Sequence, residues 1–187
     1  MGDISVSGDY SHAEGGNTQA LGDFSHAEGD GTKASGKCSH AEGSYTIASG
    51  DYSHTEGCAT IASGIYSHAE GDGTNASGEY SHAEGSWTTA SGYASHAEGY
   101  WTTASGSNSH AQGKYNISND TYADVIGNGT SVTERSNAYT MDWNGNAWFA
   151  GDIYVGSKSG KNKDKGSKKV ATIEEGTWTP KLSTTGS

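Results

Sequence analysis

Apolar positions in residues 11–118 recur with a fixed period of 14 residues, and most of them are alanine. Inside each S-H-A-E-G segment, serine and alanine alternate with histidine and glutamate. An alternation of period two is typical of a β-strand, whose successive side chains point to opposite faces. The pattern therefore predicts one short strand per segment, with His and Glu on one face and Ser and Ala on the other.

The repeating unit reads S-H-A-E-G-x-x-T-x-A-S-G-x-x. Seven full copies run from Ser11 to Asn108. An eighth begins at Ser109 and decays, with Gln112 in place of Glu and Asn116 in place of Thr. A period of 14 is too short for a helical hairpin or a propeller blade. It fits one coil of a β-solenoid, with two strands of roughly five residues and two tight corners.

Each unit also contains two fixed glycine columns, represented by Gly15 and Gly22. Glycine adopts positive φ at little cost, so both columns are predicted to form the corners of the coil.

Larger aliphatic side chains are scarce in the repeats. Between residues 11 and 108 the Leu, Ile and Val residues are Leu21, Ile47, Ile61 and Ile65. An alanine contributes little burial energy, so one chain is not expected to build an ordinary core. Repeats that cannot cover their own faces need neighbours. The composition therefore predicts an oligomer.

The unit S-H-A-E-G-x-x-T-x-A-S-G resembles the head repeats of trimeric autotransporter adhesins of the YadA-like type. Similar repeats occur in phage tail-fibre and neck-appendage proteins, beside an autoproteolytic module that is not evident in this sequence. The resemblance covers residues 7–118 and implies an all-β, left-handed parallel β-roll that forms a homotrimer. Where the adhesin repeats usually carry Val and Ile, this chain carries His and Glu, as at His12 and Glu14.

Four segments are expected along the chain: the β-roll at 1–118, an aromatic-rich β trimerisation segment at 119–156, a Lys/Gly/Ser linker at 157–169, and the start of a further β-module or tail at 170–187. Alternation predicts strands at 122–126, 137–143 and 147–155, with turns at Asn128-Gly129 and Asn144-Gly145. Residues 137–155 resemble a segment common in tail fibres of phages and prophages of Gram-positive bacteria. Since the last module only begins, we expect a piece of a longer fibre. The predicted trimer clamp comprises Trp143, Trp148, Phe149 and Tyr154.

The formal net charge of −11 is unevenly distributed. Residues 1–157 hold four cations, whereas residues 158–187 hold seven lysines and three acids. An acidic body repels nucleic acid and anionic membrane, so neither is an expected partner. No apolar run is long enough for a membrane span, and no signal-peptide pattern follows Met1. A virion or extracellular location is expected. Cys38 and Cys58 are expected to be free thiols, because they occupy different columns of the repeat and would not stack directly.

The His and Glu columns are the most conspicuous candidates for chemistry. Both residue types are ordinary zinc ligands. A structural ladder is the interpretation we favour, because every coil offers its residues the same neighbours, and no metal or cofactor is assigned. Stacked carboxylates repel by roughly 1 kcal/mol per pair in water. Adjacent histidines relieve this, which predicts a pH-sensitive rod. The ladder comprises His12, His26, His40, His54, His68, His82, His96, His110, Glu14, Glu28, Glu42, Glu56, Glu70, Glu84 and Glu98.

Two further columns invite interpretation. A threonine column resembles ice-binding arrays, but only one column is regular, so a hydroxyl ladder at a corner is favoured. An aromatic column is expected to pack between subunits. Trp87 and Trp101 occupy equivalent positions in successive coils and are candidates for glycan contact. The threonine column is Thr18, Thr32, Thr46, Thr60, Thr74, Thr88 and Thr102, and the aromatic column is Tyr10, Phe24, Tyr52, Tyr66 and Tyr80.

Catalysis needs one unique constellation of groups, whereas every Ser and His here is repeated. The chain is therefore not expected to be an enzyme. The function that the sequence favours is a structural trimeric shaft of a phage or phage-like tail fibre or receptor-binding protein, which supports host-surface attachment. Its expected partners are two further copies, other tail or fibre proteins, and cell-surface glycan. The alternatives are the trimerisation part of a self-cleaving or glycan-degrading tailspike, and a bacterial surface adhesin head.

Overall fold

The structure is a computed structural model that describes residues 3–151, 153–155 and 168–171. The chain divides into two compact units, residues 1–148 and 149–187. None of the described residues is helical, which confirms the all-β prediction. The described part likewise contains no helix of the length and apolarity needed to cross a membrane.

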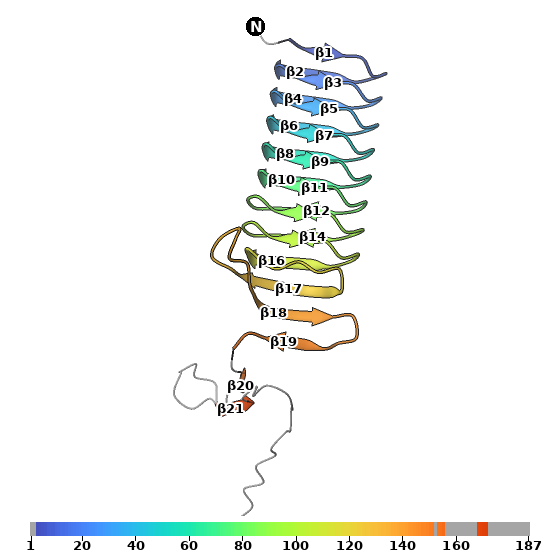
Figure 1. Ribbon diagram of the computed structural model, residues 1–187. Coiled ribbons are helices and arrows are strands. Elements are labelled where there is room, and N and C mark those ends of the chain that lie inside the picture. The colour runs from blue at the N-terminus through green and yellow to red at the C-terminus, as the bar shows by residue number, and fades with distance from the viewer. Residues whose placement is uncertain (1–2, 152, 156–167, 172–187) are drawn as a thin grey trace, which may run out of the picture. The chain divides into compact units, whose positions relative to one another are not determined.

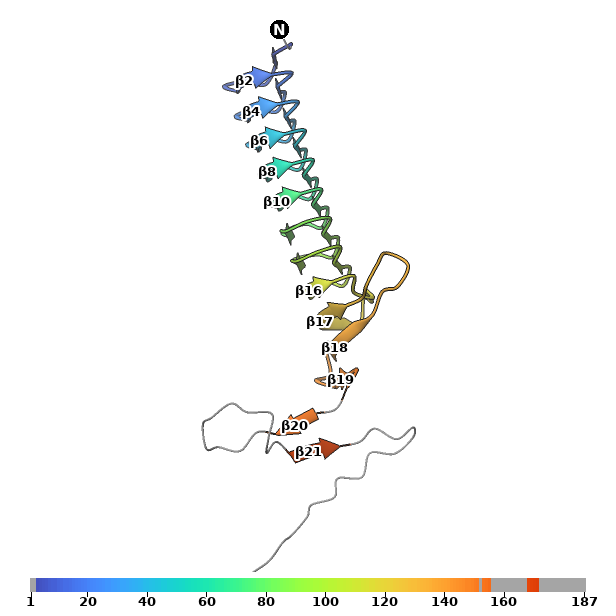
Figure 2. The same ribbon diagram turned by 90° about the vertical axis from the view of Figure 1, so that its left-hand side faces the viewer.

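Two parallel sheets run along the first unit, and each coil adds one strand to each sheet (Figure 1). One row contains the strands of the S-H-A-E-G segments (Figure 2). This row comprises β2 (His12–Gly16), β4 (His26–Asp30), β6 (His40–Ser44), β8 (His54–Cys58), β10 (His68–Asp72), β12 (His82–Ala83), β14 (His96–Ala97) and β16 (His110–Lys114). These strands have five residues except in β12 and β14, where they have two. The second row comprises β1 (Ser5–Val6), β3 (Gln19–Ala20), β5 (Lys33–Ala34), β7 (Ile47–Ala48), β9 (Ile61–Ala62), β11 (Asn75–Ala76), β13 (Thr89–Ala90) and β15 (Thr103–Ala104).

The register confirms the 14-residue coil. His12 pairs with His26, and each later strand of this row pairs with the equivalent residues of the coil before it. The second row differs from expectation, because its strands are two residues long rather than about five. The corner residues on both sides of these strands leave the ladder, which shortens the pairing. The predicted left-handed winding and trimeric assembly stay predictions.

The interior of the coil is filled by small side chains. Ala27, Ala34 and Thr32 are completely buried, and Ser39 is nearly so. Equivalent residues repeat this filling along the roll, and Val125 is the first apolar side chain larger than alanine in the core. Such small side chains let the two sheets approach closely, so a single chain closes each coil. The amount of apolar surface buried per coil nevertheless remains small.

Both glycine columns lie where the backbones of successive coils approach closely, and only the first has the predicted conformation. Gly15 has a φ of 109°, as expected for a corner glycine, and a Cβ there would also overlap the carbonyl oxygen of Gly29. Gly22 does not have positive φ. A Cβ at Gly22 would overlap the carbonyl oxygen of Gly36 in the next coil. The second column is therefore glycine because the backbones of successive coils approach too closely for any side chain.

Left-handed backbone occurs instead at the variable corner residues. Tyr52 has a φ of 58° and Trp87 a φ of 55°. This conformation costs a non-glycine residue about 1–2 kcal/mol. The surrounding ladder holds it, because the Tyr52 N–H donates to the Lys37 carbonyl of the preceding coil at 2.8 Å. The Ser53 hydroxyl closes the same corner by donating to the Gly50 carbonyl at 2.6 Å.

Asn116 ends the smaller sheet. It occupies the threonine position of the decaying repeat and is completely buried. Its side-chain amide donates to the Thr103 carbonyl at 2.9 Å, and its carbonyl accepts from the Thr103 N–H at 2.7 Å. One side chain therefore provides the hydrogen bonds that a further strand would have made to β15. The departure from the repeat at this position is a cap.

The larger sheet continues past residue 118. β17 (Tyr122–Asn128) pairs with β16 in parallel, and β18 (Asn137–Asp142) then pairs with β17 in antiparallel orientation. β19 (Ala147–Phe149) follows β18 through a turn in which Gly145 has a φ of 83°. The turn predicted at Asn144-Gly145 is confirmed, while Asn128-Gly129 begins a longer connection over residues 129–136.

The second unit contains β20 (Ile153–Val155) and β21 (Lys168–Ala171), which pair in antiparallel orientation. The strand predicted at 147–155 is thus two strands, β19 and β20. Most of the expected linker at 157–169 lies outside the described residues, and its last two residues belong to β21. Residues 172–187 of the expected further module also lie outside the described part.

Candidate functional site

The histidines from His26 to His110 form a continuous stack along the larger sheet, and His12 is tilted by 49° against His26. The ring centroids of His26 and His40 are 4.8 Å apart with an interplanar angle of 11°. His68 and His82 stack at the same centroid distance with an angle of 2°. Because the strands are in register, each ring lies above the equivalent ring of the neighbouring coil. The predicted separation of faces is confirmed, since the His and Glu side chains of β4 to β10 are half-buried while the alternate Ala and Ser side chains are buried.

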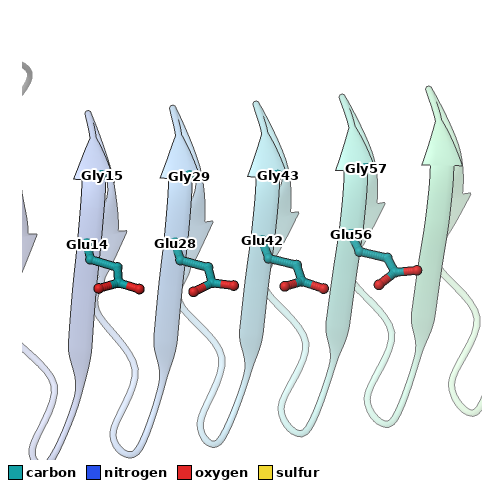
Figure 3. A pocket seen from close by; sticks show the side chains of 8 residues that line it. All are labelled: Glu14, Gly15, Glu28, Gly29, Glu42, Gly43, Glu56 and Gly57. Atoms are coloured by element: carbon teal, nitrogen blue, oxygen red, sulfur yellow. The ribbon is translucent and has the colours of Figure 1, made fainter.

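The glutamates form a second row beside the histidines. Figure 3 shows the carboxylates of Glu14, Glu28, Glu42 and Glu56 on the same side of successive strands, each extending toward the following strand. Together with the adjoining glycines they line an open groove of about 590 Å³. The glycines beside them leave this groove without side-chain cover. A row of carboxylates on one open face is therefore accessible to cations.

Histidines and glutamates approach each other mostly across coils. Nε2 of His96 lies 3.4 Å from Oε1 of Glu84, and Nε2 of His110 lies 3.5 Å from Oε1 of Glu98. In the first coils the pair is within one strand, as for His12 and Glu14 at 3.7 Å. The pair within one strand could be predicted from the sequence, because its two residues are only two positions apart. The pair across coils joins residues 12 positions apart and follows only once the register of the coils is known.

The electrostatics of the ladder depend on the position in the roll. Partial burial, together with the neighbouring imidazoles His54 and His26, lowers the pKa of His40. The same two causes lower the pKa of His54 and of His68. A side-chain hydrogen bond with Glu28, followed by desolvation, raises the pKa of Glu42 to about 6. The ladder therefore resists the addition of protons to its histidines and favours proton sharing between carboxyls.

The threonine column lies inside the coil. Thr18, Thr32 and Thr46 are completely buried, and the equivalent residues behave alike. Ice binding requires hydroxyls that reach solvent, so the ice-binding interpretation is excluded for this column. The Thr102 hydroxyl donates to the Glu98 carbonyl at 2.9 Å, whereas the other six hydroxyls of the column have no hydrogen-bond partner in the described part of the chain. The predicted hydroxyl ladder is therefore wrong, because the hydroxyls face the packed interior of the coil.

The aromatic column forms an exposed row on one corner of the roll. Tyr52 stacks on Tyr66 with centroids 4.8 Å apart, and Tyr66 stacks on Tyr80 at 5.1 Å. Tyr10 and Phe24 form a separate stack at 5.2 Å. All of these side chains remain about half exposed or more. The row is therefore a ready apolar surface in the single chain, and its expected packing between subunits stays a prediction.

Trp87 and Trp101 stack on the opposite corner with centroids 5.1 Å apart. A Cβ at Gly73 would contact the other face of Trp87, and Tyr115 stacks beyond Trp101 at 6.4 Å. The faces of these indoles are thus largely occupied by each other and by their neighbours. Their edges line a groove of about 330 Å³, which also includes Arg135. The glycan contact expected of the tryptophan pair stays a prediction.

No family model matches the sequence, and no curated protein matches it either. The resemblance to YadA-like repeats therefore rests on the repeat motif itself.

The expected clamp residues are exposed in the single chain. Trp143, Trp148 and Phe149 have exposed fractions of 57%, 51% and 41%. Rings this exposed are available for burial against another chain. The side chain of Tyr154 lies outside the described part of the structure. Both cysteines are free, as expected, with Cys58 exposed and Cys38 partly so.

Sequence reasoning missed Arg135 and the capping role of Asn116. The Arg135 guanidinium donates to the Trp101 carbonyl at 2.9 Å and to the Asn116 carbonyl at 3.1 Å. It thereby fixes the connection after β17 to the last coils of the roll. The sequence contains one weak indication that Arg135 has a specific role, because it is one of only four cations in residues 1–157.

Proposed function

We propose that this chain is a trimeric structural shaft of a phage or phage-like tail fibre, wound as a left-handed parallel β-roll, that supports attachment to a host surface. One observation carries the proposal. The coils close on alanine, serine and threonine alone, while the large apolar side chains lie outside in exposed rows.

This distribution favours association. Burial of apolar surface contributes about 25 cal/mol per Å², so alanines contribute little to each coil. The row formed by Tyr52, Tyr66 and Tyr80 retains nearly half of its surface for a partner. Trp143 and Trp148 add further exposed rings near the end of the first unit. Contact between copies would supply the burial that one chain lacks, as it does in other repeat proteins.

Three copies and a fibre follow from the resemblance to YadA-like repeats. The structure is compatible with that assignment, because successive coils repeat the same register. Stacking a repeated unit of this kind lengthens the molecule along one direction and keeps it stiff. Those are the properties that a fibre needs to hold a receptor-binding part away from a particle.

Light scattering coupled to size exclusion tests the association. The tag-free chain should have three times its 19.3 kDa mass across a wide concentration range. Replacing Trp143 and Trp148 by Ser should shift the population toward monomer while the β-roll stays folded by circular dichroism. Glu79→Gln, an exposed substitution that leaves every aromatic ring in place, provides the control. A folded monomer of the unaltered chain would contradict the proposal.

A second measurement addresses the tailspike alternative. The purified chain should keep its intact mass during prolonged incubation and should release no products from cell-surface polysaccharide. Cleavage of the chain, or depolymerisation of the glycan, would replace the structural role by an enzymatic one.

A further inference from the structure

The ladder histidines present buried nitrogen atoms that lack partners. The Nε2 atoms of His40, His54, His68, His82 and His96 are shielded from solvent and have no hydrogen-bond partner within the described structure. A buried polar atom without a partner costs free energy. Five such atoms form one row, and each lies beside carboxylates, so they are available to bind a ligand there.

The distances from these nitrogens to carboxylate oxygens also indicate which kind of ligand could bind. The cross-coil pairs of His54 with Glu42, His82 with Glu70, and His96 with Glu84 measure 3.9, 3.7 and 3.4 Å. Protein hydrogen bonds from nitrogen to oxygen span about 2.7–3.2 Å, so these pairs are too long. Two ligands that each lie about 2.0–2.2 Å from a tetrahedral zinc ion are roughly 3.3–3.6 Å apart. The pairs of His96 with Glu84 and of His110 with Glu98, at 3.4 and 3.5 Å, have this separation, and the other two exceed it by 0.1–0.3 Å.

The histidines of the middle coils, His40, His54, His68 and His82, each have two carboxylates within reach. Ligand atoms of Glu28, His40 and Glu42 lie within 4.8 Å of one another, and Glu56, His68 and Glu70 form an equivalent set. At the start of the roll the corresponding set is His12, Glu14 and His26. These three sets share no residue. One imidazole with two carboxylates is a ligand combination suited to divalent first-row metals, with positions left for water.

We propose that the His/Glu ladder is a linear array of divalent transition-metal sites, each formed by one histidine and the glutamates of two successive coils, with a two-histidine set at its beginning. Neighbouring sets share a glutamate, so ions occupy alternate sets along the ladder. At least three ions bind per chain. This proposal concerns the single chain and is independent of the proposed shaft function.

Charge supports the assignment. The row of glutamates runs along one open groove, and the region between residues 1 and 157 has few cations to compensate it. The described ion pairs of these glutamates are with histidines, which are uncharged when deprotonated. A divalent ion between two carboxylates would remove their repulsion and would at the same time provide a partner for the buried nitrogen.

Zinc is the probe for the test. The tag-free chain carries Cys38→Ser and Cys58→Ser so that thiolates contribute nothing, and it is stripped with chelator before equilibrium dialysis against Zn²⁺. Three or more ions per chain are expected. The double variant His40→Gln/Glu42→Gln should bind one ion fewer, because it removes one of the non-overlapping sets. Glu79→Gln, which removes an exposed carboxylate outside the ladder, should bind the full number.

Zinc-edge X-ray absorption on the same samples should show a first shell of nitrogen and oxygen with imidazole scattering. Circular dichroism verifies that each variant keeps its β-structure, so that loss of binding is not loss of fold. Absence of bound zinc in the stripped and reloaded chain would overturn the proposal. The proposal would also be overturned if the His40→Gln/Glu42→Gln variant bound as many zinc ions as the chain with the unaltered ladder. A zinc coordination shell without imidazole would overturn it too.

Discussion

Nε2 of His96 lies 3.4 Å from Oε1 of Glu84, a residue of the preceding coil. The relationship recurs along the roll, so side chains as well as backbone hydrogen bonds connect each coil to the last. The stability of the roll therefore depends on the protonation of the histidines and glutamates in the ladder. The predictions below are for metal-free protein in chelator at one protein concentration, because bound ions or association would shift apparent stability.

The histidines should make the roll less stable in mild acid. Burial lowers the pKa of His40, His54 and His68 below 6.5, the ordinary value that the unfolded chain retains. Between the folded and unfolded pKa values the unfolded state binds more protons, so stability rises with pH through this window. Thermal melting should therefore occur at a lower temperature at pH 5 than at pH 7. Unchanged melting between pH 5 and pH 8 would contradict the prediction.

Glu42 should oppose this trend. Its pKa is raised from 4.5 to about 6 in the folded chain, chiefly through the hydrogen bond with Glu28. The folded state then binds more protons between these values, so this contribution to stability is lost as pH rises through about 6. Glu42→Gln should melt higher than the unaltered chain at pH 8, and the difference should shrink below pH 4.5. Glu79→Gln, the same substitution at an exposed carboxylate outside the ladder, is the matched control.

The glycine columns allow a sharp comparison. Gly36→Ala should destabilise the roll by about 2–3 kcal/mol, because the added methyl overlaps the Gly50 carbonyl in the next coil and backbone must move. Gly16→Ala is the matched control within the same roll. Its Cβ would meet only the end of the Asp30 side chain. Denaturant unfolding measures both, and equal losses would show that close backbone approach is not the reason for the column.

The sequence predicted the period, the strand of S-H-A-E-G and the faces of its side chains correctly, since these follow from alternation and from the 14-residue register. It could not assign the corner conformation. Positive φ falls at Tyr52, Ala59 and Trp87, residue types that ordinarily avoid it, while Gly22 lacks it. Residue preferences are local, whereas these conformations are imposed by hydrogen bonds from the preceding coil.

The candidate site was predictable only in part for the same reason. Spacing along the chain indicates that His54 and Glu56 share a face. The close pair is instead His54 with Glu42, because each carboxylate extends across the gap between strands. Only the stacked register brings them together. The capping role of Asn116 likewise depends on a missing strand, which a single departure from a repeat does not reveal.

Ala59 offers a test of the strained corners. It is exposed and has a φ of 54°, which costs alanine about 1–2 kcal/mol that glycine avoids. Glycine loses about 0.5–1 kcal/mol more conformational entropy on folding. Ala59→Gly should therefore stabilise the roll by up to about 1.5 kcal/mol. Ala62→Gly, in the buried column three residues later, should destabilise it, and a loss of stability in both variants would contradict the strain argument.

Thr55 interrupts the alanine core. It replaces Ala in the fourth full unit, pairs with Ala41 and Ala69 of the neighbouring coils, and is completely buried. Within the described structure its hydroxyl has no hydrogen-bond partner. Thr55→Val keeps the shape and removes the unpaired hydroxyl, so it should raise the free energy of unfolding by about 1–2 kcal/mol.

The reverse change provides the control for Thr55. Ala41→Thr places the same side chain one coil earlier, in the same alanine column, where it should destabilise the roll by about 1–3 kcal/mol because added atoms strain a filled core. Denaturant unfolding of both variants decides between two explanations. If Thr55→Val lowers stability, the hydroxyl has a partner in the assembled protein. If Ala41→Thr is neutral, the column has room to spare and the close approach of the two sheets is not limiting.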